Sequence, residues 1–306
     1  MTDPTELVLT GSYVVALGVF ATFALFRFVS SGKSRPAITE DPARSDGSSP
    51  YEPPGELILP PPALPVGRVP VWFYRPVDLV GAGFVFLVFT GMFLLSQGVP
   101  AEKLVLTPEV LVVNIGFQFV IAGVVVILAM RRIDLNVWLG LRWPSWPWVF
   151  LIAPAGVVLM WVVFGGLQIS GYVEWMESLG VETVQDTVRL LQESKDPVIL
   201  GLMAAAAVIV APLCEEIVFR GYFYPVLKRF SGAWPAAICS AIVFGAAHGQ
   251  LTALLPLFIF GLLLVFIYEK TGSIWAPIAV HLCFNSATVI IQIAARHFDI
   301  PLQPAP

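Results

Sequence analysis

Long apolar runs recur along the whole chain, and they decide what it can fold into. Most of them approach the roughly 20 residues that an α-helix needs to cross the hydrocarbon core of a bilayer. Only 12% of the 306 residues are charged, against roughly 25% in soluble domains, and the mean hydropathy is +0.83. The sequence therefore predicts an all-α, polytopic membrane protein with about eight transmembrane helices. The predicted spans are residues 7–28, 77–96, 110–130, 148–167, 197–224, 234–247, 251–268 and 274–295.

The charges at the ends of these runs predict how the protein is oriented. Acidic residues precede the first run, and Arg27, Lys33 and Arg35 follow it. Under the positive-inside rule the N-terminus is then outside and the segment after the first span is cytoplasmic. Arg131-Arg132 after the third run and Lys228-Arg229 after the fifth run agree with this orientation. We expect an integral, multi-pass protein of the plasma membrane whose first span is retained rather than cleaved.

The polar stretches between the runs divide the chain into parts. Residues 30–76 contain eleven prolines, which predicts an extended cytoplasmic linker. Residues 171–196 are acidic, with valines and a leucine at helical spacing, which predicts an amphipathic helix on the outer surface. This helix is either a gating element or an ordinary connection. The predicted parts are an N-terminal transmembrane helix (1–29), the linker (30–76), accessory transmembrane helices (77–170), a polar amphipathic connection (171–196), a helical core (197–295) and a tail (296–306).

Two adjacent carboxylates and a guanidinium lie within the fifth run, at Glu215, Glu216 and Arg220. An ionisable side chain at that depth costs about 2.5–3.5 kcal/mol on insertion scales, so three together indicate a functional site. Glu216 and Arg220 are four residues apart and share a helix face, whereas Glu215 points about 100° away. The spacing predicts one carboxylate paired with arginine and one free for chemistry. The alternative for the pair is an ion pair that only holds the helix together.

Two histidines lie in the same third of the chain as the carboxylates. His248 follows the sixth run, and His281 lies within the eighth run, four residues before Asn285. A histidine and an asparagine side by side are suitable donors to an oxyanion. The structural alternative for Asn285 is a hydrogen bond to a neighbouring helix. Three glycines are predicted to allow close helix approach around these residues: Gly221, Gly245 and Gly249.

These residues together resemble the CPBP family of intramembrane proteases, which includes the Rce1-type CAAX prenyl proteases and the Abi proteins. The family pattern is Glu-Glu-x-x-x-Arg, then Phe-x-x-x-His, then His-x-x-x-Asn. It is matched here by residues 215–220, 244–248 and 281–285, all in order and all in predicted membrane helices. The resemblance covers about residues 197–293 and implies that the core at 197–295 is an intramembrane endopeptidase.

The resemblance also implies roles for single residues. Glu215 and His248 would activate a water, His281 and Asn285 would hold the oxyanion, and Glu216 with Arg220 would support the site. The implied substrate is a peptide or a lipidated C-terminal protein segment, in contact with membrane lipid. No cofactor is expected.

Other interpretations use the same residues. A zinc metalloendopeptidase would take Glu215, His248 and His281 as ligands, but His-Glu-x-x-His is absent and the three come from separate helices. A Cys283/His281 nucleophilic pair is disfavoured because residues two apart do not face each other on a helix. A non-catalytic scaffold or immunity protein and a proton-coupled transporter are the remaining classes. The sequence has no internal repeat typical of transporters and no basic block that would indicate nucleic acid.

Overall fold

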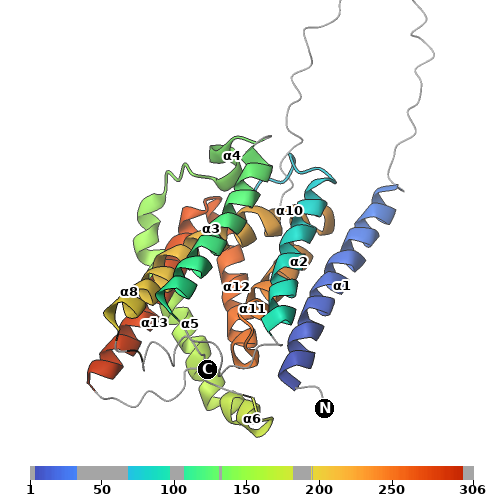
Figure 1. The fold of residues 1–306 in the computed structure, drawn as a ribbon. Coiled ribbons are helices and arrows are strands. Elements are labelled where there is room, and N and C mark those ends of the chain that lie inside the picture. The colour runs from blue at the N-terminus through green and yellow to red at the C-terminus, as the bar shows by residue number, and fades with distance from the viewer. Residues whose placement is uncertain are drawn as a thin grey trace, which may run out of the picture.

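The computed structural model describes residues 4–32, 68–96, 107–130, 133–181, 194 and 196–298. All regular structure in these residues is helical, and the helices stand side by side as a bundle (Figure 1). Most of the Pro-rich linker, most of the amphipathic connection with Val184, Val188 and Leu191, and most of the tail lie outside the described residues.

Within the described residues, seven helical stretches are long and apolar enough to cross a membrane. The remaining predicted span, the sixth (234–247), is α11 (Ala233–Ala246), which is apolar but shorter than the others. The prediction of an all-α, multi-pass membrane protein is therefore confirmed. The seven stretches are α1 (Pro4–Gly32), α2 (Asp78–Ser96), α3 (Pro108–Met130), α5 (Val149–Ile169), the composite run 197–231, α12 (Leu251–Thr271) and α13 (Trp275–His297). Short helices are α4 (Leu135–Leu139), η2 (Trp146–Trp148) and α6 (Tyr172–Ser178).

The run 197–231 is one continuous helical stretch made of five pieces. We predicted that it ends near Tyr224 and continues as a cytoplasmic loop, but the helix extends to Ser231. Val226 and Leu227 are buried, and this last piece packs on α11 and α1, so tertiary packing extends the helix beyond the apolar run. The pieces are α8 (Pro197–Ala205), the π-helical turn η3 (Ala206–Val210), α9 (Ala211–Glu215), the π-helical turn η4 (Glu216–Phe223) and α10 (Tyr224–Ser231).

A proline lies two residues beyond each π turn, at Pro212 and Pro225. The N–H of Ala211 bonds to Ala206 O, five residues back. The next bond in that register would join residue 212 to Ala207 O, but Pro212 has no N–H to donate. Asn285 Nδ2 donates to the freed carbonyl instead, at 2.7 Å. Wider π turns of this kind concentrate at functional sites.

The same substitution of partners occurs at two other prolines. Pro225 leaves the carbonyl of Gly221 without its α-helical partner, and Trp138 Nε1 donates to it at 2.7 Å. Pro256 leaves the carbonyl of Thr252 free in α12, and Tyr172 OH donates to it at 3.2 Å. Side chains from α13, α4 and α6 thus each attach to a backbone group that a proline releases.

The helices alternate in direction, so the bundle has two ends (Figure 1). We call the end that carries α4 and α10 the α4 end, and the end that carries α6 and the N-terminus the α6 end. The α11–α12 pair lies at the centre; α1 packs on α11, α13 packs on α5, and α3 packs along η3, α9 and η4. The α4 end holds the helix ends near residues 32, 78, 130, 149, 231, 233, 271 and 275, and the α6 end holds those near residues 4, 96, 108, 169, 197, 246, 251 and 297.

Candidate active site

A buried ion pair forms the base of the site. Arg220 Nη1 lies 2.9 Å from Glu216 Oε1, and both side chains are at most 1% exposed. The i,i+4 spacing predicted this contact. Arg220 Nη2 also donates to the carbonyl of Gly261 in α12, at 3.3 Å. The guanidinium therefore ties the π turn η4, which also carries Glu216, to α12.

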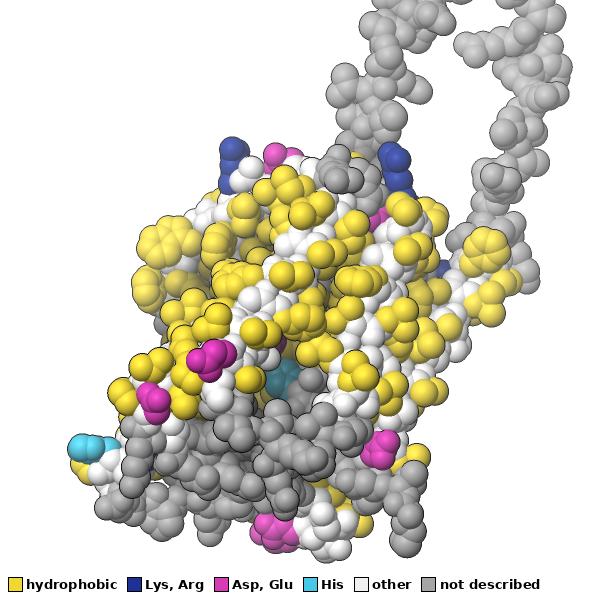
Figure 2. Space-filling view, viewed as in Figure 1, with side chains coloured by type: hydrophobic (Ala, Val, Ile, Leu, Met, Phe, Trp, Pro, Cys, Tyr) yellow, Lys and Arg dark blue, Asp and Glu magenta, His cyan; other side chains and the backbone are white. Residues whose placement is uncertain are grey.

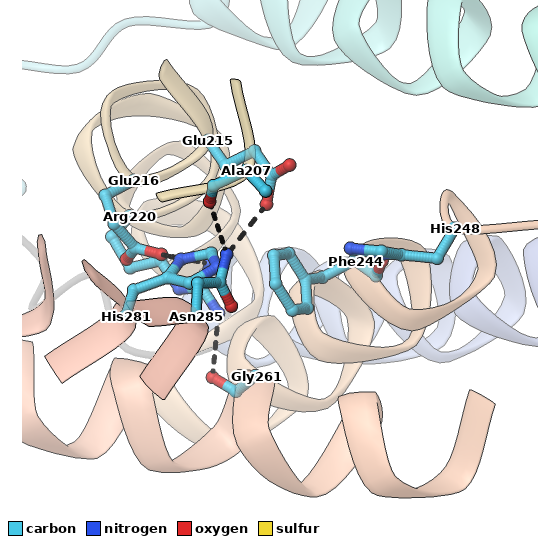
Figure 3. Close-up of polar contacts among 9 residues, drawn as sticks. All are labelled: Ala207, Glu215, Glu216, Arg220, Phe244, His248, Gly261, His281 and Asn285. Atoms are coloured by element: carbon cyan, nitrogen blue, oxygen red, sulfur yellow. Dashed lines mark hydrogen bonds and ion pairs between the residues drawn. The ribbon is translucent and has the colours of Figure 1, made fainter. Parts of the chain in front are cut away.

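His281 from α13 joins this pair. Its Nδ1 lies 2.9 Å from Glu216 Oε1, so one carboxylate oxygen serves both the arginine and the histidine (Figure 3). A carboxylate oxygen accepts, so Nδ1 carries the hydrogen and the orientation of the imidazole is fixed. The other nitrogen, Nε2, is then directed at Glu215, with 4.0 Å to Glu215 Oε2.

Glu215 differs from its neighbour in both exposure and partners. Its side chain is 22% exposed, whereas Glu216 is fully buried. Among the described residues no hydrogen bond satisfies Glu215 Oε2. The 4.0 Å to His281 Nε2 is too long for a direct hydrogen bond, and separations of this kind are commonly bridged by one water. The two adjacent carboxylates thus have different environments: Glu216 has two side-chain partners, and Glu215 Oε2 has none among the described residues.

Aromatic rings surround the polar groups. The ring centre of Phe244 lies 4.4 Å from Arg220 Cζ, 5.9 Å from the His281 ring and 5.1 Å from the His248 ring. Phe260 packs edge-on against His281 at 5.2 Å. These rings place apolar surface, rather than other polar groups, around the charged side chains. The local dielectric constant is therefore low, which strengthens the electrostatic interactions among those side chains.

A glycine allows the helices to come this close. A Cβ at Gly245 would lie 2.9 Å from Leu254 O, so α11 and α12 could not approach as they do with any larger residue. The prediction that glycines permit close approach holds for Gly245, and for Gly221, where a Cβ would lie 2.8 Å from Leu139 Cδ2. Gly249 is required for another reason, because its φ of 70° is a left-handed conformation.

Asn285 and His248 each hydrogen-bond to a backbone carbonyl rather than to the residue with which each was predicted to act. The Asn285 amide donates to Ala207 O, which is the structural alternative that the sequence left open, and its second N–H remains for another acceptor. His248 lies in the exposed turn after α11, and its Nδ1 lies 2.8 Å from Phe244 O. Figure 3 shows it on the far side of Phe244 from Glu215, and no hydrogen bond or ion pair joins it to that carboxylate in the described structure.

The site therefore brings Glu215, Glu216, Arg220, His281 and Asn285 together and leaves His248 apart. Sequence reasoning missed the contacts of His281 with both carboxylates. Nothing in the spacing could have revealed them, because residues 216 and 281 lie in separate helices.

The zinc alternative requires three ligands. Glu215 and His281 are close enough to share an ion, but His248 is not part of that group. Within the described ranges, no group of three or more His, Cys, Asp and Glu side chains could hold a metal ion. These side chains do not fit a three-ligand zinc site in this conformation, so the mechanism below uses no metal. Zinc dependence remains a hypothesis, which a chelator can test.

Comparisons with known proteins agree with the resemblance noted above. Residues 197–287, which contain every residue of the site, match the family described as type II CAAX prenyl endopeptidase Rce1-like. The chain is also 28% identical over 150 residues to a protein of Bacillus subtilis (strain 168) named "Putative membrane peptidase YdiL". That alignment covers 45% of this chain and 58% of the relative, so the chain spans little more than half of the relative's length. No solved structure gives a significant match. The C-terminal core therefore resembles the Rce1-like family, and the protein is an integral, multi-pass membrane protein.

Proposed function

We propose that this protein is an intramembrane endopeptidase of the CAAX-protease type, with Glu215 as its general base. One observation carries the proposal: Glu215 is the accessible carboxylate of the pair, and its Oε2 faces a histidine whose ring is held by Glu216. A carboxylate base and a histidine oriented beside it are two of the parts that hydrolysis of a peptide bond requires.

The proposed reaction begins with a water between Glu215 Oε2 and His281 Nε2. Glu215 takes a proton from this water, and the water oxygen attacks the carbonyl carbon of the scissile peptide. The carbonyl electron pair moves to its oxygen, where His281, protonated on both ring nitrogens, donates from Nε2 and Asn285 donates its second N–H. The C–N bond then breaks, and the proton held by Glu215 passes to the leaving nitrogen. General acid–base catalysis of this kind contributes about 10²–10⁴-fold.

His248 keeps a catalytic role in the proposal, although it does not contact Glu215 in this conformation. Its Nδ1 faces a carbonyl oxygen, which only accepts, so Nδ1 carries the hydrogen and Nε2 presents a lone pair. The exposed turn at Gly249 allows the ring to rotate toward a bound substrate. Its role is to accept or return a proton once the substrate is in place.

The test compares wild type with two variants in detergent. Glu215→Gln keeps the size of the side chain and removes its basicity. Glu177→Gln removes an exposed carboxylate on α6, away from the site, and serves as the matched control. The substrates are a farnesylated Cys-a-a-X peptide and a proteome-derived peptide library, with new peptide termini read by mass spectrometry.

We expect cleavage by wild type and Glu177→Gln, and its loss in Glu215→Gln, with or without a strong zinc chelator. Cleavage that disappears with the chelator and returns with added zinc would replace the proposal with the metalloendopeptidase. If wild type cleaves neither the library nor the lipidated peptide, the endopeptidase proposal fails and the scaffold interpretation takes its place.

A further inference from the structure

Exposure within the site changes steadily from one side to the other. Glu216, Arg220 and His281 are at most 4% exposed, Glu215 is 22% exposed, and His248 is in the exposed class. Arg220 lies on the part of the run 197–231 that continues toward the α4 end. His248 lies in the turn between α11 and α12, which is at the α6 end. The reacting groups are therefore reached from the α6 end.

The α4 end is closed above the site by a short helix and a loop. Trp138 of α4 and Tyr74 of the segment before α2 are at most 2% exposed and both donate to the carbonyl of Gly221, one residue beyond Arg220. Burial raises the pKa of the Tyr74 phenol well above its ordinary value, so Tyr74 stays a neutral donor. Tyr268 OH donates to Trp138 O at 3.3 Å, which attaches α4 to α12 as well.

A second set of buried contacts completes this closure. Lys228 of α10 pairs with Glu269 of α12 and donates to Val69 O, so the segment before α2 is attached to both helices. Ile274 N donates to Leu139 O at 2.9 Å. A layer of hydrogen-bonded, buried side chains thus separates the site from the solvent at the α4 end.

The two ends differ in charge. Figure 2 shows basic side chains gathered at the α4 end and acidic ones mostly toward the α6 end, where a hollow with a histidine at its base opens between α2 and α3. In the part of the chain that the structure describes, the lysines and arginines of the α4 end are Arg27, Arg68, Arg75, Arg142, Lys228, Arg229 and Lys270. The acidic residues of the α6 end are Glu6, Glu109, Glu174, Glu177 and Asp196, and Arg296 is the described basic residue there.

By the positive-inside rule, the basic end of a membrane protein faces the cytoplasm. We propose that the site is sealed from the cytoplasm and takes its substrate from the extracytoplasmic side of the membrane. The substrate class is then a peptide segment that emerges from the outer leaflet or is held against it, and not a lipidated C-terminus presented by the cytoplasm. The statement that a substrate enters here rests on the proposed function. The direction in which the site opens can be tested without measuring catalysis.

The first experiment maps the two ends in cells. Cys214, Cys239 and Cys283 are replaced by alanine, and single cysteines are placed at Ser178 on α6 and at Arg229 on α10, both of which are exposed. Spheroplasts of the expression host are treated with a membrane-impermeant maleimide. We expect Ser178→Cys to be labelled in intact spheroplasts and Arg229→Cys only after permeabilisation. The opposite pattern would overturn the proposal.

The second experiment asks from which side the site is reached. Glu215→Cys and His248→Cys are treated with a small, charged thiosulfonate reagent in the same spheroplasts. Ala246→Cys is the matched control, because Ala246 is fully buried two residues before His248. We expect labelling of the first two variants in intact spheroplasts and none of the control. Labelling of Glu215→Cys only after permeabilisation would show that the site opens to the cytoplasm and would sink the proposal.

The third experiment adds activity. Wild type is reconstituted into sealed liposomes, its orientation is measured by impermeant labelling, and a peptide cleaved in the detergent assay is added outside only. Cleavage should follow the fraction of protein with its α6 end outward, and detergent should release the remainder. Cleavage that follows the fraction with the α4 end outward contradicts the inference. Absence of cleavage even in detergent concerns the proposed function alone, because labelling still decides which way the site opens.

Discussion

His281 Nδ1 lies 2.9 Å from Glu216 Oε1, although the two residues are 65 positions apart and lie in different helices. This contact orients the imidazole so that its second nitrogen faces Glu215. In the proposed mechanism this contact divides the two adjacent glutamates into a supporting and a reacting residue, which is how pairs of carboxylates take different roles in one site.

The first prediction separates these two roles. Glu216→Gln removes the charge that compensates buried Arg220, and breaking a buried pair in this way costs about 3–5 kcal/mol. We expect a clear fall in the melting temperature in detergent together with loss of cleavage. Glu215→Gln should lose cleavage with little change in melting temperature. Equal melting temperatures for the two variants would contradict the division.

A second prediction concerns the carbonyl of Ala207. Asn285→Ala leaves this group without its donor, which costs about 1–3 kcal/mol. Combining it with Pro212→Ala returns a backbone N–H that can reach the same carbonyl. We expect the double variant to regain melting temperature but not activity, because the oxyanion donor is still missing. If the double variant is no more stable than Asn285→Ala, Pro212 is not the reason why the carbonyl of Ala207 lacks a backbone donor.

The third prediction tests the close approach of α11 and α12. Gly245→Ala places a methyl group 2.9 Å from Leu254 O and should push the two helices apart. Overpacking of this kind costs typically about 1–3 kcal/mol, and it should also lower kcat by moving Gly261 O away from Arg220. Gly165→Ala in α5, where a Cβ meets nothing within 4 Å, is the control and should leave melting and turnover unchanged. The measurements are thermal unfolding and initial rates.

A fourth prediction addresses the closure at the α4 end. Trp138→Phe keeps an aromatic ring and removes the Nε1 hydrogen that is donated to Gly221 O. We expect a loss of about 0.5–1.5 kcal/mol, the ordinary contribution of one hydrogen bond, because Tyr74 still satisfies the buried carbonyl, and we expect cleavage in detergent to be retained. Trp146→Phe, whose ring is exposed, should be neutral. A large loss of activity at unchanged stability would place Trp138 in the site rather than in the closure.

The fifth prediction concerns His248. Its exposed ring makes one hydrogen bond, to the carbonyl of Phe244 in the preceding helix α11, so His248→Ala should melt close to wild type. If the histidine exchanges a proton with the substrate, kcat should fall by a factor of about 10²–10⁴, with KM little changed. Wild-type turnover in this variant would remove His248 from the mechanism and leave Glu215 and His281 as the acting pair.

Much of this protein was predictable because the relevant signals are local. The length and apolarity of the runs gave the membrane spans, and the i,i+4 spacing gave the Glu216–Arg220 contact. The predicted end of the run 197–231, near Tyr224, was wrong, because Val226, Leu227 and Lys228 beyond it are buried, by packing on α11 and by the pairing of Lys228 with Glu269. Lys228 reads as a solvated cytoplasmic charge in the sequence, yet it is 4% exposed and paired.

By itself the sequence determined the all-α membrane fold, the face that Glu216 shares with Arg220 and the set of residues from which a peptidase site could be built. Only the tertiary structure decided that His281 contacts both glutamates, that Asn285 takes the carbonyl released at Pro212, that Phe244 stands between His248 and the centre, and that α4 closes one end. The physical reason is the range of the interactions. Helical periodicity fixes neighbours within a turn, whereas contacts between helices depend on how closely glycines let them approach and on which backbone carbonyls the prolines leave free.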